Sequence, residues 1–271
     1  MLDLITDESF DTENTNHYNL LIQVSLDGFS FLVVHPSEKK IVAFKNTPLK
    51  ISSEKLIARR LKEWLDSEDF LKRTFNEVRV FIFTENFTII PDEYYSEEYP
   101  LDFASVLFDQ ETDFTLIENI IEPLNARLYF PVQSDIIEVF QLFFRDSKCC
   151  HPVTGFLPNS LKSNKKNSAV IISTKRNFFL IVKRNNKLLL ANSFQNAHQS
   201  DLVYNVLNTF QQLEIARTET DLFIADVISD NTELKSLLLP YFENIFSLET
   251  DDLNVNKHFI KNHLLRYLNK N

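Results

Sequence analysis

The stretch from Asn19 to Leu49, NLLIQVSLDGFSFLVVHPSEKKIVAFKNTPL, decides the fold. It contains two apolar runs, Leu20–Ser25 and Phe29–Val34, which meet at Asp27-Gly28, and a third run at Ile41–Lys45. An Asp-Gly pair between such runs predicts a hairpin, because glycine adopts positive φ without steric cost. The stretch therefore predicts three consecutive antiparallel strands.

A helix, a buried strand and a further strand and helix are expected to complete the first half. Ser52 or Ser53 is a helix N-cap candidate, and the residues after it repeat apolar side chains at helical spacing. The later elements are a buried strand at Val78–Thr84, a strand at Arg127–Pro131 and a helix at Ile136–Phe144.

The second half of the chain repeats this layout. Three expected strands precede a helix capped by Ser200, a buried strand and two more helices; they are Ala169–Ser173, Phe178–Lys183, Leu188–Asn192, Leu222–Val227, Glu233–Phe242 and Val255–Leu268. Lys40 corresponds to Lys187, and Ser53 to Ser200, each at an offset of 147 residues (187 − 40 and 200 − 53). A repeat at a fixed offset predicts a duplicated domain.

The pattern predicts an α/β protein with two RNase H-like lobes, the architecture of actin, Hsp70 and sugar kinases. Each lobe is expected to be a mixed five-stranded sheet covered by helices, with a cleft between the lobes. The expected organisation is a flexible lead-in at 1–17, a first lobe at 18–150 with an insertion at about 91–113, a linker at 151–167, and a second lobe at 168–271. A short helix is expected near Asp102–Phe108 within the insertion.

Composition excludes several classes of function. The net charge of −10 disfavours binding to nucleic acids and to anionic membrane surfaces. No apolar run approaches the length of a membrane-spanning helix, and the start of the chain lacks a secretory signal pattern. The adjacent Cys149 and Cys150 are no disulfide framework, so we expect a reduced, cytoplasmic protein.

Two blocks of the sequence resemble an uncharacterised Bacteroidetes family of unknown function with an actin-like ATPase fold. The first is LDGFSF at Leu26–Phe31, and the second is LLLANSFQNAHQSDLVYNVLNTFQQL at Leu188–Leu213. The resemblance extends from about Tyr18 to Leu248. It implies the actin-like fold and supplies no reaction, because the family has no assigned activity.

The actin-like resemblance implies phosphate-binding hairpins, which this chain lacks in part. Such ATPases hold phosphates with an Asp-x-Gly hairpin in each lobe and the adenosine with a Gly-Gly loop. Here the first hairpin has Asp27-Gly28 with Phe29 after it, and the second has Thr174-Lys175-Arg176-Asn177, without acid or glycine. The chain has two glycines and no Gly-Gly pair. We therefore expect no ATP turnover, and neither ATP nor Mg²⁺ as a cofactor.

Candidate metal ligands are sparse. Asp27 and Glu85 follow neighbouring strands and could hold Mg²⁺ for phosphodiester cleavage, with Glu54 or Glu63 on the first helix as a further acid. The alternative, which we favour, is that these are surface or turn carboxylates. Cys149-Cys150-His151 lacks a second cysteine pair and the spacing of a tetrahedral site.

Two further features are candidates for binding. Lys175 and Arg176 occupy the turn that faces the cleft in actin-like folds, and could hold an acidic peptide or a phosphate group; the alternative is a solvated hairpin tip in the basic stretch Lys162–Lys187. The acidic segment Asp92–Asp113 carries aromatic side chains typical of a contact surface, or of an insertion packed on its own domain. They include Tyr94, Tyr95, Tyr99 and Phe103.

The sequence thus predicts a non-catalytic actin-like scaffold or adaptor that binds a protein partner, with no catalytic residue. The alternative is a nucleotide-binding protein of the actin/Hsp70/sugar-kinase class with a divergent site. A nuclease is the third hypothesis.

Overall fold

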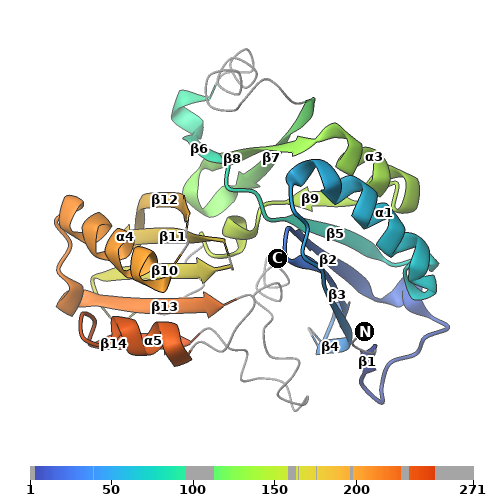
Figure 1. Cartoon of the computed structure of the whole chain (residues 1–271), viewed down its shortest axis with the longest axis horizontal. Helices are drawn as coiled ribbons and strands as arrows, with labels where there is room; N and C mark the ends of the chain where they lie inside the picture. Colours follow the sequence, from blue (N-terminus) through green and yellow to red (C-terminus); the bar gives the residue numbers. More distant parts are fainter. Residues whose placement is uncertain are drawn as a thin grey trace. The chain divides into compact units, whose positions relative to one another are not determined.

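Two compact units make up the computed structural model (Figure 1). The structure describes residues 4–38, 40–95, 113–157, 163, 165–174, 176–195, 198–226 and 232–247. Unit 1 comprises the described residues within 1–120 and 127–152, and unit 2 those within 121–126 and 153–247. Each unit is described by itself below.

The main sheet of unit 1 has six strands in the order β1-β4-β3-β2-β5-β9. Strands β2, β3 and β4 form the predicted antiparallel meander, and β5 and β9 add to it in parallel. The sheet has one strand more than the predicted five, because β1 pairs with the outer edge of β4. The strands are β1 (Ile5–Thr6), β2 (Asn19–Ser25), β3 (Gly28–His35), β4 (Lys40–Pro48), β5 (Glu77–Ile82) and β9 (Lys148–Cys150).

Helix α1 (Ile57–Ser67) connects β4 to β5 and lies beside α3 (Ser134–Phe143), as Figure 1 shows. It buries Ile57, Leu61, Trp64 and Leu65, the apolar face that the helical spacing predicts. The ring of Trp64 packs 5.3 Å from that of Phe29. The 3₁₀ turns η2 (Glu54–Leu56) and η3 (Asp69–Lys72) flank this helix.

A second, three-stranded sheet in unit 1 corrects one prediction. The strand expected at Arg127–Pro131 is part of β8 (Ala126–Gln133), which lies between β6 (Thr88–Pro91) and β7 (Phe114–Ile121). The parallel edge of the main sheet is β9 instead. The sequence pattern misses β9 because a three-residue strand is too short to show periodicity, and it misses β7 because half-exposed side chains interrupt the alternation.

Unit 2 contains a five-stranded sheet in the order β12-β11-β10-β13-β14. This order matches β4-β3-β2-β5-β9 of unit 1 strand for strand. The strands are β10 (Asn167–Ser173), β11 (Asn177–Arg184), β12 (Lys187–Gln195), β13 (Thr220–Asp226) and β14 (Asn244–Ser247). Residues of α4 (Gln199–Gln212) and α5 (Thr232–Leu238) join one apolar core with the sheet.

The strand registers show that the two sheets are copies of one pattern. Asn19 lies opposite Glu77 in the first parallel pair, and Asn167 lies opposite Thr220 in the second. Strand β4 begins at Lys40 and β12 at Lys187, so the offset of 147 residues (187 − 40) holds for these two strands, whereas β5 and β13 begin 143 residues apart (220 − 77). Each of these strands also forms a register shift with its neighbour, between Val33 and Val34 and between Val182 and Lys183.

Several predicted boundaries differ from the structure. Helix α4 begins at Gln199 after His198, whose backbone N–H donates to the Asp201 carboxylate at 2.9 Å, so Ser200 is not the N-cap. Helix α5 ends at Leu238, and β14 occupies residues that the sequence pattern left unassigned. The helices expected near 102–108 and 255–268 lie outside the described residues. No helix of the described part is long and apolar enough to span a membrane.

The expected lead-in and linker both contain ordered contacts. Residues 4–17 include β1 and the 3₁₀ turn η1 (Thr15–His17), where the buried Thr15 donates its hydroxyl proton to the carbonyl oxygen of Thr74. In the expected linker, η6 (Pro152–Gly155) is followed by Phe156 and Leu157, which are buried.

Candidate functional site

The β2–β3 turn places Asp27 and Gly28 in different roles. Ser25 pairs with Gly28, so the two residues within the turn are Leu26 and Asp27. Gly28 has φ +129°, and a Cβ atom there would lie 2.3 Å from the carbonyl oxygen of Thr47. Glycine is therefore required because the end of β4 approaches its backbone so closely.

The backbone groups of this turn bond within the chain. The carbonyl oxygen of Asp27 accepts from the N–H of Leu49 at 3.0 Å, and that of Leu26 accepts from the N–H of Ile51 at 2.9 Å. The N–H of Asp27 donates to the hydroxyl of Ser25 at 3.2 Å. The hairpin is thus closed by its own unit.

The backbone groups of the β10–β11 turn also bond within the chain, although this turn contains no glycine. The hydroxyl oxygen of Thr174 accepts from the N–H of Asn177 at 3.1 Å and from the N–H of Arg176 at 3.4 Å. Thr174 in turn donates its own N–H to the carbonyl oxygen of Asn177 at 2.9 Å. Lys175 lies outside the described residues. The N–H groups of these three residues therefore point into the turn.

The carboxyl-end edge of the unit 1 sheet carries Asp27 and Glu85, as their positions after β2 and β5 predict. Among the described residues, no group of three His, Cys, Asp or Glu side chains could hold a metal ion. The described effect of Glu85 is on the pKa of Glu54. Surrounding protein atoms and then the negative charge of Glu85 raise the pKa of Glu54, although part of that side chain remains exposed.

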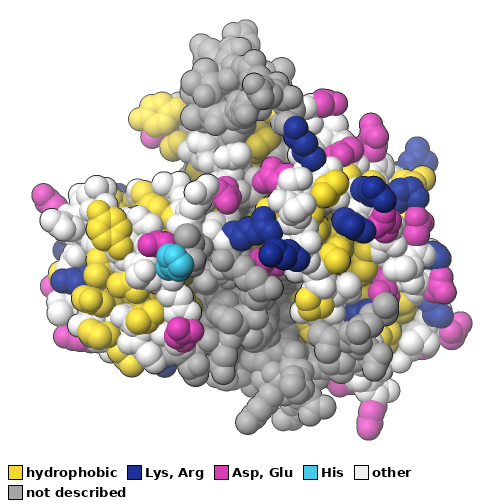
Figure 2. Space-filling model, in the orientation of Figure 1, with side chains coloured by type: hydrophobic (Ala, Val, Ile, Leu, Met, Phe, Trp, Pro, Cys, Tyr) yellow, Lys and Arg dark blue, Asp and Glu magenta, His cyan; other side chains and the backbone are white. Residues whose placement is uncertain are grey.

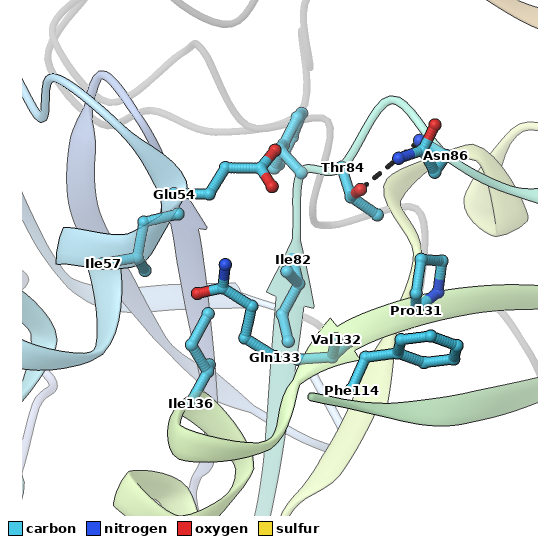
Figure 3. Close-up of a pocket in the computed structure, with 11 residues that line it drawn as sticks. Glu54, Ile57, Ile82, Thr84, Asn86, Phe114, Pro131, Val132, Gln133 and Ile136 are labelled. Atoms are coloured by element: carbon cyan, nitrogen blue, oxygen red, sulfur yellow. Dashed lines mark hydrogen bonds between the residues drawn. The ribbon is translucent and has the colours of Figure 1, made fainter. Parts of the chain in front are cut away.

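A pocket of about 230 Å³ lies at this edge of unit 1 (Figure 3). It is lined by the residues that follow β5, by the start of η2 and α1, by Phe114 at the start of β7 and by the junction of β8 with α3. Most of its wall is apolar. The lining residues are Glu54, Ile57, Ile82, Phe83, Thr84, Asn86, Phe114, Pro131, Val132, Gln133 and Ile136.

Side-chain oxygen atoms of two residues that line this pocket accept no hydrogen bond from the described residues. The Oε1 atom of Gln133 is buried and accepts no hydrogen bond in the described structure. The carboxylate of Glu54 points over the pocket above Gln133, as Figure 3 shows, and receives no hydrogen bond from the described side chains. A buried acceptor without a donor is unusual in a native protein, and it marks this pocket as a candidate binding site.

His151 has a structural role close to this pocket. Its Nε2 donates to the carbonyl oxygen of Thr84 at 3.0 Å, and its backbone N–H donates to Asn119 of β7 at 2.8 Å. Its ring packs 4.6 Å from that of Phe87. Burial lowers the pKa of His151 to about 3, so the imidazole is neutral and connects the two sheets of unit 1.

The basic stretch of unit 2 is largely used within its own fold. Lys183 is buried, and its ammonium donates to the carbonyl oxygen of Leu157; burial lowers the pKa of Lys183 to about 8. Arg184 donates to the carbonyl oxygen of Leu213 at 2.9 Å, and Lys165 pairs with Glu243 at 3.0 Å. These residues are not the solvated tips that the alternative interpretation expected.

Of the predicted partner surface, the structure describes Tyr94 and Tyr95. Tyr94 is 69% exposed. The ring of Tyr95 lies 4.0 Å from the guanidinium of Arg127, which also donates to Glu118 at 2.9 Å and to Asp92 at 3.1 Å. Tyr99 and Phe103 lie outside the described residues. Tyr94 is thus exposed, whereas Tyr95 next to it contacts a cluster of charged side chains.

The exposed face of α1 is a poor candidate for an interface core. Figure 2 shows Lys and Arg side chains interspersed with Asp and Glu over this helix. Arg59 and Arg60 pair with Glu63, and Lys62 pairs with Asp66. Interface cores are depleted in such charged residues.

Comparisons with known proteins agree with this architecture. A structure from Bacteroides thetaiotaomicron VPI-5482, described as having an actin-like ATPase fold and unknown function, has a TM-score of 0.81 at 21% identity over 96% of this chain and 98% of that one. A chain of the PilM-PilN type IV pilus biogenesis complex has a TM-score of 0.55 at 9% identity over 92% of this chain and 94% of that one. A search of curated proteins gave no match.

The doubled sheet and these neighbours define an α/β protein of the actin-like ATPase fold, which confirms the predicted fold class. The family model described as "Protein of unknown function (DUF3822)" matches residues 7–245. The chain belongs to this family.

The sequence predicts the edge of the sheet but not the pocket. It does not single out Gln133, and it gives no sign that Glu54 faces a site. The available signal is local: Gln133 is the last residue of β8 and directly precedes Ser134-Asp135 at the start of α3, a junction that commonly opens a site in α/β folds.

Replacing Gly28 should destabilise unit 1. The Gly28→Ala variant places a Cβ atom 2.3 Å from the Thr47 carbonyl oxygen, so we expect a loss of about 2 kcal/mol or more. The measurement is urea unfolding followed by the fluorescence of Trp64, the single tryptophan. As a control, Asp27→Ala should change stability by about 0.5 kcal/mol or less. Equal stability of Gly28→Ala and the wild type would contradict this assignment.

Acidification should destabilise unit 1 through His151. The folded pKa of about 3 lies below the unfolded value of roughly 6.5, so the unfolded chain binds a proton that the folded chain does not. The free energy of unfolding should therefore fall by about 1 kcal/mol between pH 7 and pH 5.5. In His151→Gln this pH dependence should be lost, while the exposed-site control His17→Gln should retain it. An unchanged slope in His151→Gln rejects the buried neutral imidazole.

Proposed function

We propose that this protein is a non-catalytic actin-like scaffold or adaptor that binds a protein partner and does not turn over ATP. The observation that carries the proposal is that backbone N–H groups of both hairpin turns donate within their own turn, that of Asp27 in the first and those of Thr174, Arg176 and Asn177 in the second. Phosphate sites built from loops need backbone N–H groups directed at the ligand. In the β10–β11 turn, the N–H groups of Thr174, Arg176 and Asn177 are directed at Thr174 and Asn177 instead.

The size of the unit 1 pocket supports a polypeptide ligand for that site. Its volume of about 230 Å³ is below the roughly 300 Å³ at which pockets for drug-sized molecules begin. One side chain of a partner fits such a volume. The exposed Tyr94, on the same unit, offers an amphipathic anchor of a type that interfaces favour.

The fold is compatible with partner binding. The PilM-PilN structure shows a chain of this fold class in a complex with a second protein. At 9% identity this similarity concerns the fold, and the identity of any partner of the present protein is a separate question.

The alternative is a nucleotide-binding protein that uses side chains in place of glycine loops. It would need donors such as the guanidinium of Arg176 to replace the backbone groups. The closed turns favour the adaptor over this alternative.

The proposal is tested by recovering and reconstituting a partner. The tagged full chain is used for affinity capture from native lysate, and each enriched protein is purified and titrated against the purified chain with and without Mg-ATP. We expect one protein to bind directly, with an affinity that Mg-ATP does not change. Failure of every enriched protein to bind directly, or binding only with Mg-ATP, would contradict the proposal.

A matched pair of variants locates the surface. Tyr94→Ala should weaken binding of that partner at least about fivefold, because a central aromatic anchor contributes strongly to an interface. Tyr204→Ala removes an equally exposed ring, 68% against 69%, from α4 of unit 2 and should leave the affinity unchanged. The reverse pattern would place the contact on unit 2.

A further inference from the structure

The two duplicated sheets differ at one outer edge. In unit 1 the outer side of β4 pairs with β1, whereas its counterpart β12 is the last strand of the unit 2 sheet (Figure 1). Within the described part of the chain, no strand pairs with the outer side of β12. Because an edge strand presents a row of backbone N–H and C=O groups, this side of β12 is able to accept a further strand.

Unit 1 shows which kind of segment such an edge accepts. Strand β1 pairs antiparallel with β4. The N–H of the next residue, Asp7, donates to the carbonyl oxygen of Val42 at 2.9 Å. The carboxylate of Asp7 accepts from the ammonium of Lys40, the first residue of β4, at 2.7 Å. The added segment thus combines backbone pairing with one ion pair.

The register of β12 places matching residues at matching positions. Val42 is the extra residue at the register shift between β3 and β4, and Leu189 is the extra residue at the shift between β11 and β12, 147 residues later (189 − 42). Lys187 begins β12 as Lys40 begins β4. The register shift does not prevent strand addition, because in unit 1 the segment of β1 bonds to Val42 itself.

Strand β12 is more exposed than β4 at these positions. Leu189 is 41% exposed, whereas Val42 is 2% exposed. Lys187 is exposed and forms no ion pair with another described residue. From Leu188 to Gln195 the strand contains no charged residue and no proline, which are common means of protecting an edge strand from pairing.

The described chain supplies no strand of its own for this edge. The residues at the same offset from β1 are Pro152 and Val153 (5 + 147 and 6 + 147), and they lie in the 3₁₀ turn η6. Val153 is buried. The described residues that correspond to β1 therefore do not form a strand in unit 2.

We propose that the outer edge of β12 binds an extended segment of another protein, which adds antiparallel to the sheet and places an acidic side chain against Lys187. By the register of unit 1, this acid lies opposite Leu189, and an apolar residue two positions before it lies opposite Ala191. Backbone hydrogen bonds supply affinity in this mode of recognition, and the side chains supply specificity. The inference goes beyond the adaptor function proposed above, because it gives unit 2 a binding site of its own.

A second copy of this chain is a less suitable occupant. Two β12 strands in antiparallel pairing bring no acidic side chain to either Lys187, because the strand contains none. An acid-containing segment of another protein supplies both the backbone pairing and the opposite charge.

The segment that covers β4 supplies the probe. The ¹⁵N-labelled full chain is titrated by NMR with the terminally blocked peptide LITDESF, the sequence of residues 4–10. We expect saturable shifts of the amide signals of Leu189 and Ala191. The amide signals of Val42 and Phe44 report on β4, where the peptide has to displace β1, and should not move.

An exchange of charges tests the register. Lys187→Glu should weaken binding of LITDESF about fivefold, because it replaces an attraction across the strands with a repulsion. The peptide LITKESF should instead bind Lys187→Glu about fivefold more tightly than it binds the wild type. Lys50→Glu makes the same change of charge at an exposed position of unit 1 and should leave both affinities unchanged.

Several results would overturn this proposal. They are the absence of saturable shifts at Leu189 and Ala191, shifts confined to Val42 and Phe44, and equal effects of Lys187→Glu and Lys50→Glu. A dimer in sedimentation equilibrium that Leu189→Lys converts to a monomer would also overturn it, because a second copy then covers β12. The peptide titration needs no reconstituted partner, so its result is independent of the test of the adaptor function.

Discussion

The contact between the backbone of Gly28 and the backbone of β4 is the constraint on which unit 1 depends. It brings the end of β4 over the β2–β3 turn, so that Leu49 and Ile51 donate to the carbonyl oxygens of Asp27 and Leu26. The chain then enters η2 and α1, where Trp64 donates to the hydroxyl of Thr47 at 3.1 Å. The glycine that a nucleotide site would use for a phosphate is used here to pack the protein against itself.

Unit 2 forms its hairpin turns with other residues and without glycine. Its first turn is closed by the hydroxyl of Thr174, and its second hairpin turns at Asn185 and Asn186, both at positive φ. Asparagine tolerates this backbone region better than most residues, which explains how the duplicated sheet persists without glycine. The same strand order is thus present in both units, although their hairpin turns are built from different residues.

The fold was predictable because its information is local and repeated. The Asp-Gly hairpin, the helical face around Trp64 and the offset between Lys40 and Lys187 are each visible in the sequence, and together they predict a doubled unit. The candidate site was predictable only in part. Asp27 and Glu85 do follow neighbouring parallel strands. The negative charge of Glu85, however, acts on Glu54 and raises its pKa, and residues of β8 form part of the pocket wall. Tertiary contacts decide that β8 joins the three-stranded sheet and not the main one. The periodicity of the sequence within Ala126–Gln133 does not predict this.

The central claim, that both turns are closed to phosphate, is tested most directly by NMR on the uniformly ¹⁵N-labelled full chain. The amide signals of Asp27, Gly28, Arg176 and Asn177 are followed during titration with Mg-ATP up to millimolar concentration. The account predicts that these four signals do not move. Saturable shifts of Asp27 and Gly28 together with Arg176 and Asn177 would contradict it, because they would show nucleotide bound at both hairpins.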